Sequence, residues 1–171
     1  MKYWVVGLLF VALSVFPVLS YAISWNKTDD LFVIERSKNK NCVQYVARLM
    51  ENNDLQGSSP VAVYWVLEDG RQENLSLIER KYAYGIHSQE KLEKNRFKIL
   101  LTAFKDREII LEKIDGSFKA IAYIDGRESI LDRIFIESKE GLTGLPKVLY
   151  VDVFGRTKEA SLPVRERIIP R

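Results

Sequence analysis

The stretch EIILEKIDGSFKAIAYIDG, residues Glu108–Gly126, decides the fold class of this chain. It contains two apolar runs, Glu108–Ile114 and Phe118–Ile124, which are separated by Asp115-Gly116, and Asp125-Gly126 follows the second run. Alternate positions of the second run are apolar, which is typical of a strand with one face turned inward. Asp-Gly pairs favour the type I′ turn that joins antiparallel neighbours. The stretch therefore predicts an antiparallel hairpin that leads at once into another strand.

Similar apolar runs separated by turn residues occur on both sides of this stretch, with Lys105-Asp106 expected as one of the turns. Pro163 indicates that the last run lies at an edge of the sheet. We predict an all-β domain with one short helix, in which an antiparallel meander forms a barrel-like or strongly curved sheet. Two packed sheets are the alternative, and closure is favoured because it removes exposed edges. The predicted strands are Leu31–Arg36, Val43–Leu49, Val61–Leu67, Phe97–Phe104, Glu108–Ile114, Phe118–Ile124, Ile130–Glu137, Lys147–Phe154 and Thr157–Ile168.

The one predicted helix begins after Ser76, because Ser76 and Glu79 have the spacing of a capping box. Gly85 is placed to end it, since glycine adopts the left-handed conformation without steric cost. The helix is too short to be stable alone and must pack on the sheet. We expect its contact side to consist of Leu77, Ile78 and Tyr82.

The first residues have the pattern of a secretory signal peptide. Lys2 precedes an apolar run, Trp4–Leu19, and Ser20-Tyr21-Ala22 supplies small residues for cleavage after Ala22. We therefore expect residues 1–22 to be a signal peptide and residues 23–171 to form a single β-rich domain that is periplasmic or secreted. The alternative is an uncleaved leader that anchors the chain in the inner membrane, which is the only membrane association we expect.

The chain contains one cysteine, Cys42, and one histidine, His87. Cys42 is interpreted as a small buried hydrophobe, with a reactive thiol as the alternative. The two residues form a nucleophile–base pair only if the fold brings them together. No serine-hydrolase, calcium-loop or phosphate-loop motif occurs, so we expect no catalytic residue, metal or cofactor. The net charge of +3 is spread along the chain and does not indicate nucleic acid binding.

Two cations and two phenols gather at the predicted helix end, where Arg80, Lys81, Tyr82 and Tyr84 precede Gly85. Cations at a helix C-terminus are favourable through the helix dipole, so a structural role explains this cluster. The alternative is a ligand site in which Arg80 or Lys81 binds an anionic group and Tyr82 and Tyr84 form walls. Tyr45, Tyr64 and Trp65 extend such a wall, although core packing is the favoured interpretation for each of them, since aromatic residues dominate strand cores.

The blocks Leu31–Leu49 and Val61–Gly85, together with Lys147–Arg156, resemble a bacterial family known as domain of unknown function 4833. They contain a strand that ends in an Arg-Ser-x-Asn-like turn, a Tyr-Trp strand, and an Arg-Lys-aromatic-Ala-Tyr-Gly helix end. Cys42 stands where a small polar or β-branched residue is expected. The resemblance implies an exported β-rich domain, and it implies no activity, substrate or catalytic residue.

These observations favour a non-catalytic module that binds a small, partly apolar or anionic ligand. Such a module requires a cavity lined by tyrosine and tryptophan with a cation nearby. The alternative is an envelope protein-interaction or assembly module without a small-molecule site. That module requires an exposed apolar patch or an accessible sheet edge.

Overall fold

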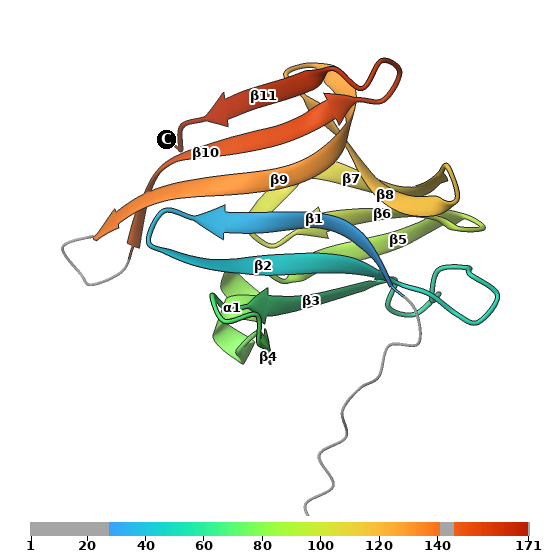
Figure 1. Ribbon diagram of the computed structural model, residues 1–171, viewed down its shortest axis with the longest axis horizontal. Helices are drawn as coiled ribbons and strands as arrows, with labels where there is room; N and C mark the ends of the chain where they lie inside the picture. The colour runs from blue at the N-terminus through green and yellow to red at the C-terminus, as the bar shows by residue number, and fades with distance from the viewer. Residues whose placement is uncertain (1–27, 141–145, 171) are drawn as a thin grey trace, which may run out of the picture.

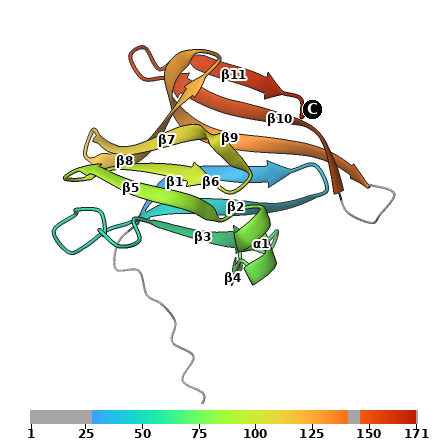
Figure 2. The same cartoon turned by 180° about the vertical axis from the view of Figure 1, so that it is seen from behind.

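The computed structural model describes residues 28–140 and 146–170, which form one strongly curved sheet and one short helix (Figures 1 and 2). The prediction of an all-β fold with a barrel-like, strongly curved sheet is confirmed. The elements are β1 (Thr28–Arg36), β2 (Asn39–Arg48), β3 (Val61–Val66), β4 (Gln72–Asn74), α1 (Leu77–Tyr82), β5 (Ile86–Glu93), β6 (Arg96–Leu101), β7 (Phe104–Ile114), β8 (Ser117–Ile124), β9 (Arg127–Glu140), β10 (Pro146–Thr157) and β11 (Pro163–Ile168).

The sheet is a half-barrel with the strand order β4-β3-β2-β1-β9-β8-β7-β6-β5. Strand β10 pairs with the other side of β9, and β11 pairs with β10. The pairs described are antiparallel except one, in which Val33–Arg36 of β1 runs parallel to Arg133–Ile136 of β9. The antiparallel meander predicted from the turns is therefore present from β5 to β11, and the parallel pair makes the whole sheet mixed.

Strand β9 changes its neighbour part-way along its length. Residues Arg127–Ile130 pair with β8, and residues Arg133–Ile136 pair with β1. At the changeover the ladder to β10 shifts, so that Asp132 is an extra residue on β9. Because such a bulge bends a strand and increases its twist, it lets β9 serve both groups of strands.

The concave side of the half-barrel is filled by apolar side chains. Tyr45 and Phe118 are fully buried, as are isoleucine and leucine side chains from β6, β7, β8 and β9. The two Asp-Gly turns have the predicted type I′ conformation, since Asp115 and Asp125 have φ of 50° and 51° and the glycine after each also has a positive φ.

The sequence pattern did not predict two strands, β4 and β5, and it placed one turn wrongly. Strand β5 is almost entirely exposed and polar, so it has no apolar period, and β4 spans three residues only. The turn predicted at Lys105-Asp106 is wrong: the chain turns at Thr102-Ala103, and Lys105 lies within β7. The charged pair resembles a turn because this end of β7 faces solvent.

Helix α1 has the predicted capping box, with Ser76 Oγ accepting from the Glu79 amide at 3.2 Å. The predicted contact side is wrong, because Leu77, Ile78 and Tyr82 are 84%, 73% and 67% exposed. A polar contact binds the helix to the sheet instead: the indole of Trp65 donates to Glu79 Oε1 at 3.2 Å. The Glu79 carboxylate therefore directs its own side of this short helix toward the sheet, and the side with Leu77, Ile78 and Tyr82 faces solvent.

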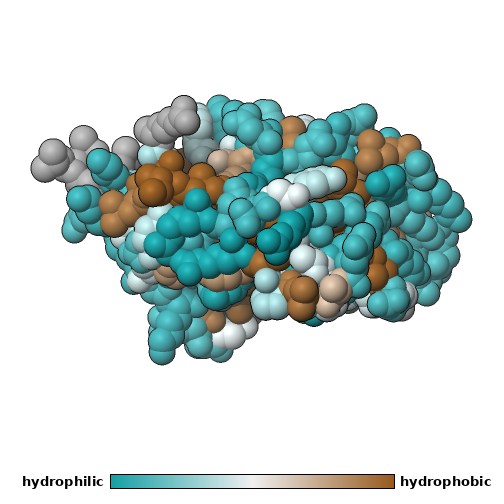
Figure 3. Space-filling model, turned by 90° about the horizontal axis from the view of Figure 1, so that it is seen from above, coloured by the Kyte–Doolittle hydropathy of each residue, from teal (hydrophilic) through white to brown (hydrophobic). Residues whose placement is uncertain are grey.

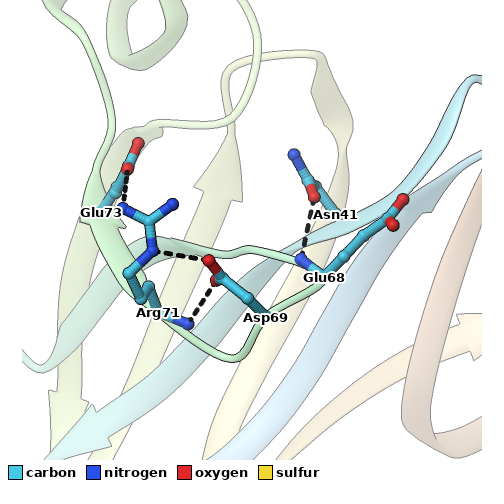
Figure 4. Close-up of polar contacts among 5 residues, drawn as sticks. All are labelled: Asn41, Glu68, Asp69, Arg71 and Glu73. Carbon is cyan, nitrogen blue, oxygen red and sulfur yellow. Dashed lines mark hydrogen bonds and ion pairs between the residues drawn. The ribbon is translucent and has the colours of Figure 1, made fainter.

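The hairpin from β3 to β4 is fixed by local polar contacts (Figure 4). Arg71 donates from its backbone and its Nε to the Asp69 carboxylate, at 3.0 and 2.6 Å. The Glu68 amide donates to Asn41 Oδ1 at the start of β2. These contacts set the position from which the chain enters α1.

No helix within the described ranges is long and apolar enough to cross a membrane. The predicted leader and its cleavage site after Ala22 lie outside the described residues.

We expect Gly155→Ala to lower the free energy of unfolding by about 1–3 kcal/mol. Gly155 lies at the bulge, where an added Cβ would be 2.3 Å from the Ile130 carbonyl oxygen and 2.7 Å from Ile124 Cδ1. Gly57→Ala is the matched control, since nothing lies within 4 Å of a Cβ added there. Urea unfolding of both variants measures the effect, and equal stabilities would show that the bulge tolerates the methyl group.

Candidate functional site

Three of the residues predicted to form the wall of a ligand site, Tyr45, Tyr84 and Trp65, lie close together, and their role is packing. Tyr45 is fully buried, its ring is stacked on Phe32 with 4.3 Å between centroids, and its hydroxyl donates to the Tyr84 carbonyl. Tyr84 packs edge-on against Trp65 at 5.2 Å. Burial raises the pKa of Tyr45 far above its usual value. These rings join the chain after α1 to β2 and β3, and they fill the space between them.

The other helix-end residues are exposed. Arg80, Lys81 and Tyr82 all face solvent, and the Lys81 ammonium lies 5.2 Å from the centroid of the Tyr82 ring. None of them lines the four hollows that lie at residues 103–107, 127–128, 137–140 and 30–33. The helix end therefore brings a cation and a phenol together on an exposed surface.

Tyr64 and Cys42 lie apart from the aromatic packing. Tyr64 neighbours Trp65 on β3, so its side chain points to the opposite face of the sheet. Cys42 is half-buried; burial, and then the charge of Glu35, raise the pKa of its thiol, which opposes thiolate formation. His87 is exposed on β5, and no hydrogen bond joins it to Cys42 among the described residues. Those residues also contain no group of histidine, cysteine, aspartate and glutamate side chains suited to a metal ion.

A groove of about 460 Å³ opens on the concave side, where β9, β10 and β11 continue past the core. Ile136, Val148 and Val151 form its floor, and Ile168 and Pro170 form the β11 flank. Facing them is the start of β7, residues 103–107. In the view from above, hydrophobic residues gather at the end of the molecule where the C-terminus lies (Figures 1 and 3). The volume lies within the range of about 300–1,000 Å³ typical of ligand sites.

One end of the groove is closed by an ion pair between β7 and β11. Arg107 Nη1 and Nη2 donate to the two carboxylate oxygens of Glu166 at 2.9 and 2.7 Å. The Asp125 amide donates to the same carboxylate at 3.0 Å. The hydrogen bonds from Arg107 are the main cause that lowers the pKa of Glu166. This Arg107–Glu166 clasp joins two strands that have no backbone ladder between them.

A second cation, Lys105, lies on the β7 flank two residues before Arg107, with Asp106 between them. Lys105 is exposed, and within residues 28–140 and 146–170 it has no carboxylate partner. An apolar floor with a cation at its rim can hold a molecule that has an apolar body and an anionic group.

Sequence reasoning missed this groove, because its residues come from four strands that are distant along the chain. Two signals pointed toward it. Pro163 correctly placed the last strand at an edge, and Phe104-Lys105-Asp106 put a large apolar residue beside charges. Only the curvature of the sheet brings the two segments to face each other.

A family model described as Domain of unknown function (DUF4833) matches residues 32–167. This chain belongs to that family. The match runs from β1 to β11, so the floor and the β7 flank of the groove lie within the DUF4833 region, and Ile168 and Pro170 of the β11 flank lie just beyond it. No curated protein and no solved structure matches the chain.

We expect the clasp to make stability depend on pH. The folded-state pKa of Glu166 is lowered, so its ionised carboxylate stabilises the folded state. This stabilisation is fully present above the ordinary pKa of about 4.3 and is lost as pH falls through the folded-state pKa. Glu166→Gln should therefore be less stable than wild type at pH 7, and the gap should shrink below about pH 4. Urea unfolding from pH 7 to pH 3 measures the gap.

The exposed Glu159 provides the matched control as Glu159→Gln. A gap for Glu166→Gln that stays constant with pH would contradict a charge-dependent clasp.

Proposed function

We propose that this DUF4833 domain is a non-catalytic binding module that takes a small, partly apolar ligand with an anionic group into the groove between β7 and β11. The single observation that carries the proposal is an apolar groove of about 460 Å³ beside a lysine without a carboxylate partner in the described residues. Burial of apolar surface supplies affinity, and Lys105 orients the charged end.

The structure supports a different location for the ligand from the helix end considered first. Tyr84 packs on Trp65, and Tyr45 donates to the Tyr84 carbonyl and stacks on Phe32, so these residues take part in packing. The groove has free space, and its floor is formed by rigid strands. A ligand can enter there without displacing the core.

A second candidate function is docking of a protein partner in the cell envelope. It is favoured by the three exposed apolar side chains of α1, Leu77, Ile78 and Tyr82, which lie together on one short helix. An exposed cluster of this kind often marks an interaction surface. The two candidates use different surfaces, so variants can separate them.

The apolar anion 1-anilinonaphthalene-8-sulfonate is a suitable probe of the groove. Its fluorescence should rise on binding to the wild-type chain. Lys105→Glu should weaken binding about fivefold, as expected for loss of one exposed ion pair, and Ile168→Gln should weaken it about tenfold through lost apolar contact. Fluorescence titration gives the affinities.

Two controls accompany this titration. Lys91→Glu makes the same charge change on β5, and Leu77→Gln removes an apolar side chain of α1; both should bind like wild type. Near-ultraviolet circular dichroism checks that each variant keeps fixed packing, because molten globules also bind this dye. If the groove variants bind like wild type and Leu77→Gln does not, the helix surface is the binding surface.

We further propose that the domain acts outside the cytoplasm, periplasmic or secreted, after removal of the leader. The support is the charged start, apolar run and small-residue exit of residues 1–22. The mass of the protein purified from bacterial periplasm should correspond to a chain beginning at Ile23. Intact mass spectrometry measures this, and a full-length chain in the inner-membrane fraction would favour the anchored alternative.

A further inference from the structure

We propose that the natural ligand of the groove is an extended peptide segment of a partner protein, which pairs as an added strand between β11 and the start of β7. This inference rests on the proposed function, because it assigns a ligand class to the same groove. Addition of a strand to a free sheet edge is a common mode of peptide recognition.

Both flanks of the groove present free strand edges. Among the described residues, β11 pairs with β10 alone. The ladder between β7 and β8 begins at Ile110, so the stretch from Phe104 to Ile109 has no β8 partner. Backbone groups on both flanks are therefore available to a segment that lies between them.

The gap between the flanks is spanned by side chains instead of backbone bonds. Arg107 donates to the Tyr123 carbonyl on β8 and to the Glu166 carboxylate on β11. This clasp ends the groove on one side, and from there the flanks run to Phe104 and Pro170. The β7 flank from Phe104 to Arg107 is four residues long, and a paired strand has the same rise of about 3.4 Å per residue, so a segment of about four residues fits beside it.

The floor of the groove sets the inward residues of such a segment. Ile136, Val148 and Val151 present apolar side chains, and alternate residues of a bound strand would point toward them. The inward positions should therefore be apolar, with the outward positions free to differ.

The outer surface of β11 sets the outward residues. Arg165 and Arg167 are 51% and 44% exposed, and both donate to the carboxylate of Asp152, which is 4% exposed. Their guanidinium groups also lie over the rings of Phe154 and Tyr150, at 5.4 and 3.8 Å. The buried carboxylate and the rings hold these cations in place, with their remaining donors directed outward.

Lys105 adds a further cation on the opposite flank of the gap. Outward residues of an inserted strand would lie on the side of β11 that carries the two arginines, and Lys105 stands at the rim of the groove on the opposite flank. Charge complementarity therefore selects acidic residues at those positions. The expected ligand is an extended segment in which apolar and acidic residues alternate.

The test uses the full chain as the cell processes it and the probe acetyl-Val-Glu-Val-Glu-Val-amide. This peptide should displace 1-anilinonaphthalene-8-sulfonate, and hydrogen exchange should slow at β11 and at the start of β7. The same peptide with Lys in place of Glu should bind at least about fivefold more weakly, and a peptide with Pro at its centre should not compete, since proline cannot donate to a ladder.

A charge exchange provides the decisive comparison. Lys105→Glu should weaken the acidic peptide and strengthen the lysine peptide, and Lys91→Glu should change neither. If the dye binds in the groove but no peptide displaces it, the peptide inference is overturned and the small-ligand function stands. If neither dye nor peptide binds the folded chain, both proposals are overturned.

Discussion

The whole sheet depends on how β9 shares its hydrogen bonds. On one side it pairs first with β8 and then with β1, and on its other side β10 follows it along almost its full length. The extra residue at Asp132 makes this exchange of partners sterically feasible, because a bulge bends the strand where one neighbour ends and the next begins. The strands from β1 to β4 and those from β8 to β5 therefore diverge from one point and enclose the same apolar core. Gly155 lies opposite the bulge, where the backbone of β9 leaves no space for a side chain.

The groove is a direct consequence of that branching. Strands β10 and β11 follow β9 beyond the point at which β7 separates from β8, so Val151 and Ile168 continue an apolar surface that no further described strand covers. Elsewhere the interior is filled, as full burial of Tyr45 and Phe118 shows. The apolar groove lies at the end of the half-barrel where two strand edges face each other. A site at that position can be occupied without any change in the core.

The sequence predicts the local structure well and the candidate site poorly. Asp115-Gly116 and Asp125-Gly126 predicted their turns correctly, because the required backbone conformation is a property of a few adjacent residues. The capping box at Ser76 was predicted for the same reason. The contact side of α1 was not, since Leu77 and Ile78 are apolar and yet a hydrogen bond from Trp65 to Glu79 decides which side faces the sheet. The parallel pairing of β1 with β9 joins segments about a hundred residues apart, and no local pattern specifies it. The groove depends on that pairing and on the curvature it produces. The sequence-based prediction therefore placed the site at the tyrosines near the helix end instead.

Three ion pairs between strands lie where the sheet branches at β9 and where β7 and β11 approach each other without a ladder. Arg133 pairs with Glu35 where β1 joins β9, Arg156 pairs with Asp132 at the bulge, and Arg107 pairs with Glu166 where β7 and β11 approach without a ladder. At each of these three points a cation and a carboxylate from different strands add a side-chain contact. Lys105 lies beside the start of β7 that has no β8 partner, and among the described residues it forms no ion pair with the neighbouring Asp106 or with another carboxylate. An acidic group from outside the chain would complete the same arrangement at this position. The groove therefore contains a cation without such a contact, and this is the physical reason to expect a ligand with a negative charge there.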